Sequence, residues 1–129
     1  MTQEDFNKLT QSVIASAIEV HKELGPGLLE SVYEICLMEE LKNRNIKAIN
    51  QVKLPVSYKG KELNKEFIID ILVENELVIE LKSVEEILPV HEVQLLTYLR
   101  LADKKLGLLI NFNVPALKDG IRRRINGYL

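Results

Sequence analysis

Residues 67–83 read FIIDILVENELVIELKS, two apolar runs that flank a polar turn around Asn75. The short β-branched runs are typical of strands, and the turn between them predicts a hairpin. Centring the hairpin on Asn75 places Asp70 opposite Glu80, and Glu80 shares a strand face with Lys82. Like charges that face each other are destabilising, and a buried charge is costly unless it is paired or binds a metal. The stretch therefore predicts a charged cluster in a buried sheet, with a divalent cation as the natural counter-charge.

The length and composition of the chain limit the class of protein to which this hairpin can belong. A chain of 129 residues suits a single domain, residues 1–129, that is large enough to bury a core. Its 17 basic and 19 acidic side chains give a net charge of −2, so no overall basic signal for nucleic acid is present. The single cysteine, Cys36, excludes an internal disulfide and a cysteine-based zinc site, and we expect a buried structural thiol. A polar N-terminus and short apolar runs predict no signal peptide or membrane span, with the cytoplasm as default location.

The periodicity predicts two helices, three strands, a helix and a strand, in the order ααβββαβ. A mixed sheet with helices on both faces is the simplest architecture for this α/β (α+β) pattern, because the last helix joins two apolar strands. The tail from Asn113 is ambiguous between a short edge strand and a helical turn, and we favour the strand. The expected elements are a capped helix from Thr2 to a stop at Gly25-Pro26, a helix after Gly27, strands over Lys47–Tyr58, Leu63–Leu72 and Leu77–Lys82, a helix over Val90–Ala102, and a strand over Leu106–Phe112.

Several side chains have ordinary structural interpretations. Pro55 predicts an edge position or a bulge in the first strand. His21 is expected to be partly buried near the end of its helix. In the second helix, Leu29 and Val32 are expected in the apolar stripe, and Glu34 on a solvated face. In the third helix, the apolar side is expected to hold Val90, Val93 and Leu101.

The hairpin resembles a nuclease signature. Its pattern Asp70-x9-Glu80-x-Lys82 is similar to that of the PD-(D/E)xK superfamily, with Ile69 where the proline of that name would stand. Residues 27–33 match GxxExxY, the motif that names a bacterial protein family, and three longer stretches also resemble that family. These stretches are HKELGPGLLESVYE (21–34), ELKSVEEILPVHEVQLLTYLRL (80–101) and GLLINFNVPALKDGI (107–121). The likeness runs from about His21 onward and implies a restriction-endonuclease-like fold.

The resemblance also implies a catalytic set. Asp70 and Glu80 would bind Mg2+ or Mn2+, hard cations that prefer oxygen ligands, and the backbone carbonyl of Leu81 would add a third oxygen. Lys82 would position the attacking water or stabilise charge on the phosphate. Glu30 resembles the extra helical acid of many such nucleases. By itself, Glu30 is equally well explained as a favourable charge in a first helical turn.

A second group of residues resembles substrate-binding positions. Gln94 and Tyr98 lie one helical turn apart and are similar to the Gln-x3-Tyr motif of the exonuclease branch of the superfamily. Tyr33, the last residue of GxxExxY, is grouped with them as a substrate-binding or supporting residue. Without the rest of the pattern, Gln94 and Tyr98 would be a surface amide beside a half-buried ring. His91 is expected in a supporting or solvent-facing role.

These residues lead to two hypotheses about function, one for an enzyme and one for a binding module. The first is a Mg2+-dependent phosphodiesterase acting on DNA or RNA, and the alternative is a catalytically silent nuclease-like module for binding or assembly. A homodimer would supply more contacts to a partner than so small a monomer. The arginine run is as consistent with a solvated edge as with a nucleic-acid contact. The basic residues available for a phosphate track are Lys53, Lys59, Lys61, Lys65, Arg100, Lys104, Lys105 and Arg122–Arg124.

Overall fold

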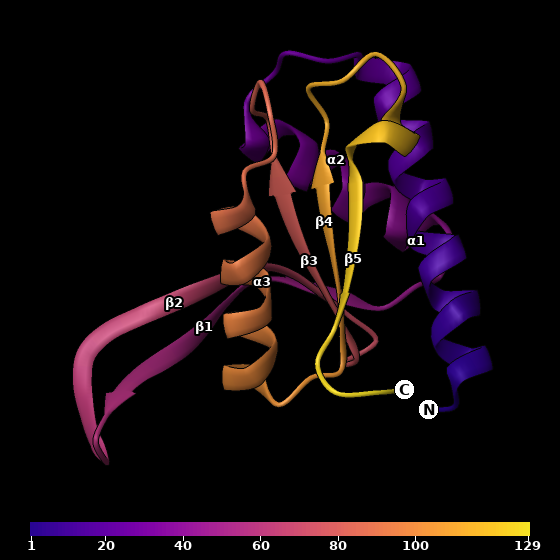
Figure 1. Cartoon of the computed structure of the whole chain (residues 1–129). Coiled ribbons are helices and arrows are strands. Elements are labelled where there is room, and N and C mark those ends of the chain that lie inside the picture. Colours follow the sequence, from indigo (N-terminus) through magenta and orange to yellow (C-terminus); the bar gives the residue numbers. More distant parts are fainter.

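The computed structural model describes residues 1–129 as a five-stranded mixed sheet with helices on both faces (Figure 1). The predicted fold class is therefore confirmed, and the tail adds the favoured last strand. The elements are α1 (Gln3–Leu24), α2 (Glu30–Asn43), β1 (Ala48–Tyr58), β2 (Lys61–Val73), β3 (Leu77–Lys82), α3 (Pro89–Ala102), β4 (Leu106–Asn111), a short 3-10 helix η1 (Leu117–Gly120) and β5 (Ile121–Ile125).

The strands lie in sequence order, β1-β2-β3-β4-β5. Strands β3 and β4 are parallel and are joined by α3, whereas the other neighbours are antiparallel. Strand β3 is central, and all residues from Leu77 to Leu81 are buried. Strand β1 is an edge strand whose register shifts between Pro55 and Ser57, so both features expected from that proline are present.

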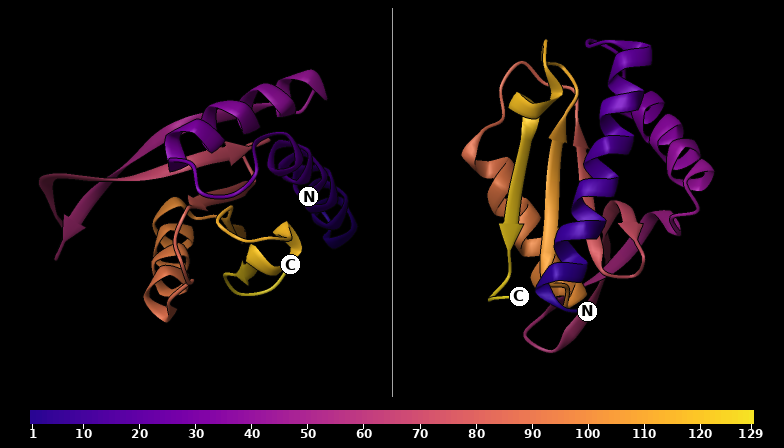
Figure 2. Two further views of the ribbon diagram at one scale, coloured as in Figure 1. Left: turned by 90° about the horizontal axis from the view of Figure 1, so that it is seen from above. Right: turned by 90° about the vertical axis from the view of Figure 1, so that its right-hand side faces the viewer.

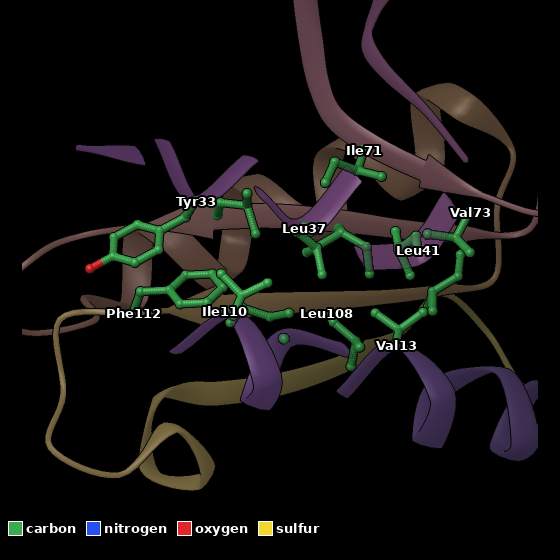
Figure 3. Close-up of a cluster of buried hydrophobic side chains, with 14 of the residues drawn as sticks. Val13, Tyr33, Leu37, Leu41, Ile71, Val73, Leu108, Ile110 and Phe112 are labelled. Atoms are coloured by element: carbon green, nitrogen blue, oxygen red, sulfur yellow. The ribbon is translucent and has the colours of Figure 1, made fainter. Parts of the chain in front are cut away.

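Two apolar layers cover the sheet. Helices α1 and α2 pack on one face and α3 packs on the other (Figure 2). The larger cluster holds 17 buried residues, among them Tyr33, Leu37 and Ile110 (Figure 3). The smaller cluster, of seven buried residues, joins Leu95 and Leu99 of α3 to the opposite face of the sheet. Burial of such side chains, worth about 1.5–3 kcal/mol each, stabilises the centre of the sheet.

Local signals fixed several boundaries as expected. Thr2 and Asp5 form a capping box at the start of α1, and α1 ends at Gly25, whose φ of 73° is left-handed. The turn between β2 and β3 is centred on Asn75, with Val73 paired to Leu77. These features depend on neighbours in the chain, which is why sequence alone predicts them.

The buried sides of two helices differ from expectation. Leu29 precedes α2 and is 73% exposed, and Val32 is also exposed, so Tyr33, Leu37 and Leu41 alone are buried on α2. In α3, the predicted side of Val90, Val93 and Leu101 is exposed. The buried residues of α3 are Leu95, Tyr98 and Leu99. Apolar residues lie all around α3, so the sheet beneath it, rather than its own periodicity, decides which side is buried.

Strands β1 and β2 change faces at one position. Ala48 and Ile71 pack in the cluster below α1 and α2, whereas Val52 and Ile69 pack in the cluster below α3. The change falls at Gln51, which lies across from Asp70 in the register and has a left-handed φ of 53°. Beyond it, Val52–Tyr58 and Lys61–Ile69 form a two-stranded ribbon that projects from the body (Figure 1), and we refer to it as the ribbon.

Candidate functional site

The candidate site lies where β2 separates from β3. Their pairing covers only Ile71–Val73 with Leu77–Ile79, and β3 then continues beside β4 alone. Extending this register places Asp70 opposite Glu80, as the hairpin predicted. We call Asp70, Glu80 and Leu81 the strand fork. Amides that lose their ladder partners at such a point need other acceptors.

The two carboxylates of the strand fork supply these acceptors across the gap. The Asp70 amide donates to Oε1 of Glu80 at 3.1 Å, and the Leu81 amide donates to Oδ2 of Asp70 at 2.8 Å. In a strand, the carbonyl of a residue points to the same edge as its amide, so the Leu81 carbonyl also faces β2. Three oxygen-bearing groups of two strands therefore converge on one gap.

Burial and like charge perturb both carboxyl groups. Burial, followed by the Asp70 charge, raises the pKa of Glu80 to about 8. Burial also raises the pKa of Asp70, with further contributions from Glu34 and Glu30, although the Leu81 amide and Lys82 act in the opposite direction. Such pairs of carboxyl groups are typical of functional sites, because they ionise together only when a positive charge offsets their repulsion.

The donor set of the strand fork fits a hard cation. The second oxygen of each carboxylate makes no hydrogen bond and is not sealed from solvent. No group of three or more His, Cys, Asp or Glu side chains in the protein is arranged to hold a metal ion. A cation here would thus have two carboxylates and the Leu81 carbonyl as protein ligands, with water or a phosphate oxygen completing an all-oxygen shell.

Lys82 ends β3 on the same strand face as Glu80 and is half-buried. Its backbone carbonyl accepts a hydrogen bond from the Phe112 amide at 2.9 Å. The next loop is held by the buried Asn111, whose side chain bonds both the amide and the carbonyl of Val84 at 3.0 Å. The Lys82 backbone is therefore anchored on both sides, which restricts where its ammonium group can reach.

Helix α2 brings two acids to the strand fork. Glu30, the predicted helical acid, is exposed in the first turn of α2, and its charge acts on Asp70. Glu34 acts on Asp70 more strongly. Glu34 also accepts hydrogen bonds from Asn50 at 3.1 Å and Gln51 at 2.7 Å, so this half-buried acid contacts β1 as well as the predicted solvent. The only sequence signal for Glu34 is its spacing of one helical turn from Glu30.

Tyr33 lies in the core. Its ring is fully buried and stacks on Phe112 with centroids 4.3 Å apart (Figure 3). Its hydroxyl donates to the Gly25 carbonyl at 2.6 Å and accepts from the Leu28 amide at 3.1 Å. Tyr33 therefore fixes the loop that precedes Glu30, which is a supporting contact with the chain itself.

The opposite face contributes Tyr98 from α3. Tyr98 is 7% exposed, and burial and then the Glu80 and Asp70 charges raise its pKa. Gln94, one turn earlier, is exposed, so its amide faces solvent. The side chain of His91 accepts from the Leu88 amide at 3.0 Å and thereby caps α3. Tyr98 is thus the α3 side chain whose pKa responds to the two carboxylates.

Cavities do not coincide with the strand fork. A hollow of about 720 Å³ lies between α2 and the start of β1, lined by Ile35, Met38 and Lys47 among others. A hollow of about 530 Å³ is lined by Leu28, Leu29 and Ser83, and Ser83 adjoins Lys82. We base the site on its charged groups, because an open phosphate site on a sheet edge need not be a deep pocket.

The sequence of the chain matches a known family. The family model described as PD-(D/E)XK nuclease superfamily matches residues 7–124. The chain belongs to the PD-(D/E)XK nuclease superfamily. The match includes the whole hairpin and all the candidate site residues. Membership agrees with the resemblance of Asp70, Glu80 and Lys82 to the superfamily signature.

Other comparisons place this superfamily member among known proteins. The crystal structure of SSO0001 is similar to it, with 27% sequence identity and a TM-score of 0.53. The similarity covers 78% of this chain and 51% of SSO0001, so the chain spans about half the length of that protein. None of the curated proteins matches. No helix combines the length and apolar character that crossing a membrane requires.

Proposed function

We propose that this superfamily member is a nuclease that hydrolyses phosphodiester bonds of DNA or RNA with Mg2+ or Mn2+ at the strand fork. The observation that carries the proposal is the crossed pair of carboxylates, Asp70 and Glu80, beside Lys82 at the point where the sheet opens. A buried acid, Glu80, beside the half-buried Asp70 that repels it is costly in a protein that has no use for the pair. A cation and a phosphate together would satisfy both the acids and the lysine.

Each group has a proposed role. The carboxylates of Asp70 and Glu80 and the carbonyl of Leu81 would hold the metal, which when bound polarises the phosphate and lowers the pKa of a bound water. Lys82, with three donor hydrogens and a fixed backbone, would orient the water or bind a phosphate oxygen. Its positive charge also favours the ionised form of both carboxyl groups.

The helices supply the remaining groups. Glu30 would hold a second metal or orient the water from the α2 side. Gln94 and Tyr98 would contact the substrate backbone from α3, and Tyr33 would support Glu30 through the loop it fixes. We also infer that residues 27–33 make this a GxxExxY-type member, and a homodimer stays a prediction that sedimentation would test.

A second candidate function rests on the same hydrogen bonds. The carboxylates of Asp70 and Glu80 already satisfy amides that the separating strands would leave unpaired. They therefore have a structural use even without a metal. A catalytically silent module that binds or assembles with a partner would retain this arrangement.

Cleavage of labelled single- and double-stranded DNA and RNA, with Mg2+ or Mn2+, tests the proposal. The informative variants are Asp70→Asn, which keeps the shape and an acceptor for the Leu81 amide, and Lys82→Gln. We expect each to lower the cleavage rate by roughly 100-fold or more, because each removes a group that acts on the transition state. The matched control is Glu66→Gln, an exposed acid on the same strand β2.

Metal binding separates the two candidate functions. Calorimetric titration of the wild-type protein with Mn2+ should give a binding signal that Asp70→Asn lacks. Absence of binding at millimolar Mn2+, with the fold intact, would favour the silent module. Cleavage that persists in both Asp70→Asn and Lys82→Gln would mean that the activity belongs to another site or to a contaminant.

A further inference from the structure

The ribbon extends far beyond the strand fork. From Asp70 to Lys61 it runs nine residues, or roughly 30 Å at the rise of an extended strand. A duplex of that length holds about nine base pairs. The rest of the chain is compact around the sheet (Figures 1 and 2), so the ribbon is the element with reach along a polymer.

The two faces of the ribbon carry different charges. Phe67 and Ile69 pack toward α3, and residues of β2 at the same parity, Lys61 and Lys65, share that face. The pairs on both sides of the register shift, Pro55 with Glu66 and Ser57 with Glu62, keep this alternation of faces. The face toward α3 therefore carries two lysines and no acid. The outer face carries Glu62, Glu66 and Lys53.

The ribbon lysines have no acidic partners. The protein contains three ion pairs, and none involves Lys53, Lys59, Lys61 or Lys65. Lys59, at the tip, lies over the ring of Tyr58, with its ammonium group 5.5 Å from the centroid. The amines of Lys61 and Lys65 are exposed and available to bind phosphate.

The arginines of the run Arg122–Arg124, unlike the ribbon lysines, have partners within the protein. Arg124 pairs with Glu92, and Arg123 donates to Asn7. Arg122 donates to the carbonyls of Asp119 and Ile121. All three guanidinium groups are therefore engaged within the protein, although they form the densest basic run of the sequence. The ribbon lysines, by contrast, have no ion-pair partner within the protein.

Aromatic side chains connect the ribbon to the site. The centroids of the Phe67 and Tyr98 rings lie 5.5 Å apart. The charges of Glu80 and Asp70 in turn contribute to the raised pKa of Tyr98. Lys65 is two residues from Phe67 on the same face. The α3-facing side of the ribbon thus connects Phe67, beside Tyr98, with Lys65 and Lys61.

We propose that the α3-facing side of the ribbon binds the phosphodiester backbone of the nucleic-acid substrate through Lys61 and Lys65. This inference rests on the proposed function and specifies where the polymer runs. Phosphate contacts position a substrate without reading its sequence, which suits a surface with two flexible ammonium groups. The backbone leaving the strand fork would pass Phe67 and follow the ribbon toward its tip.

Binding of labelled DNA tests this proposal independently of cleavage. The probe is a 30-nucleotide single strand and, separately, its 30-base-pair duplex, measured by fluorescence anisotropy with Ca2+ in place of Mg2+. The variants are Lys65→Glu and, as matched control, Lys53→Glu on the outer face of the same ribbon. We expect Lys65→Glu to raise Kd about tenfold and Lys53→Glu to raise it less than about twofold, with the preferred probe identifying the strandedness.

Salt dependence and length provide a second readout. Lys65→Gln should reduce the slope of log K against log salt by about 0.9 on duplex or 0.7 on single strand, the value for one lost phosphate contact. The difference in Kd and in salt slope between wild type and the Lys65 variants should vanish on a probe too short to reach the ribbon. Equal effects of the changes at Lys65 and Lys53, in proteins with wild-type melting curves, would overturn the ribbon proposal and leave the nuclease proposal standing. Failure of the wild-type protein to bind either probe at low salt would also overturn the ribbon proposal, whereas loss of cleavage alone would leave it intact.

Discussion

The two halves of strand β2 lie in different surroundings although they form one continuous strand. Residues Ile71–Val73 are buried and pair with both β1 and β3. Residues Lys61–Ile68 pair with β1 alone and are exposed apart from the half-buried Phe67. The carboxylate of Asp70 lies at the boundary between these halves. One half therefore holds the fold together, and the other is free to contact a partner.

This difference shows why a charged site can exist inside an apolar sheet. On the buried side of the boundary, ladder hydrogen bonds and side-chain packing hold the strands in place. At the boundary, Asp70 and Glu80 replace the ladder with bonds from their carboxylates. The stability lost by placing the buried Glu80 beside the half-buried Asp70 is offset by the neighbouring apolar layers. Such a local sacrifice of stability is typical of functional sites.

The largest expected effect is a difference in free energy of unfolding between alanine variants of two isoleucines of β2. Ile71→Ala should lower the free energy of unfolding by about 3 kcal/mol, because Ile71 is fully buried in the larger cluster. Ile68→Ala should lower it by less than about 1 kcal/mol, because Ile68 is 41% exposed on the outer face of the ribbon. Urea unfolding of both variants measures the difference. Equal losses would show that the ribbon is part of the cooperative core.

A second prediction concerns Glu80, at the boundary itself, and the dependence of the free energy of unfolding on pH. The Glu80 carboxyl has a pKa of about 8 in the folded protein against an ordinary value of 4.5. The folded state therefore binds more protons than the unfolded state between these values, and the free energy of unfolding falls as pH rises from about 4.5 to about 8. Glu80→Gln should remove this contribution, and at pH 9 without metal it should stabilise the protein by on the order of 2 kcal/mol.

The control for this prediction is Glu66→Gln on the exposed half of β2. Chemical unfolding at pH 4, 6.5 and 9, with a chelator present, gives the comparison. Glu80→Gln should match wild type at pH 4 and exceed it increasingly at higher pH, whereas Glu66→Gln should track wild type throughout. A constant offset of Glu80→Gln at all three pH values would contradict the assigned titration.

The sequence predicted that Asp70 faces Glu80, because local rules determine the hairpin register, but it did not predict that the two strands separate at this point. The turn residues around Asn75 and the spacing of the two apolar runs set the hairpin register, and the register alone places Asp70 opposite Glu80. In the same way, Gly25 and Pro26 determine the end of α1. Family membership agrees with the resemblance of the hairpin to the superfamily signature.

The features that sequence did not predict depend on tertiary placement. The buried side of α3 is set by the sheet, so Val93 and Leu101 are exposed despite their apolar character. The change of faces at Gln51 requires a positive φ, and the sequence has no glycine there that would have predicted it. Glu34 resembles any solvated helix acid until the strand beneath it is known. Its partners, Asn50 and Gln51, lie 16 and 17 residues away in the chain.

The smallest expected effect tests whether Glu34 helps to fix the boundary. Glu34→Ala removes the acceptor of both the Asn50 and the Gln51 side chains, and it should lower the free energy of unfolding by about 0.5–1 kcal/mol, because exposed hydrogen bonds contribute modestly. Glu39→Ala, at an exposed position of the same helix, is the matched control with the same change in charge and helix propensity. Hydrogen exchange adds a local readout, since loss of the Glu34 contacts should speed exchange at the Gln51 and Asp70 amides and leave that of Ile71 unchanged. If both variants lose the same stability and exchange alike, the helix does not hold the boundary, and the left-handed turn at Gln51 is sustained by the strands alone.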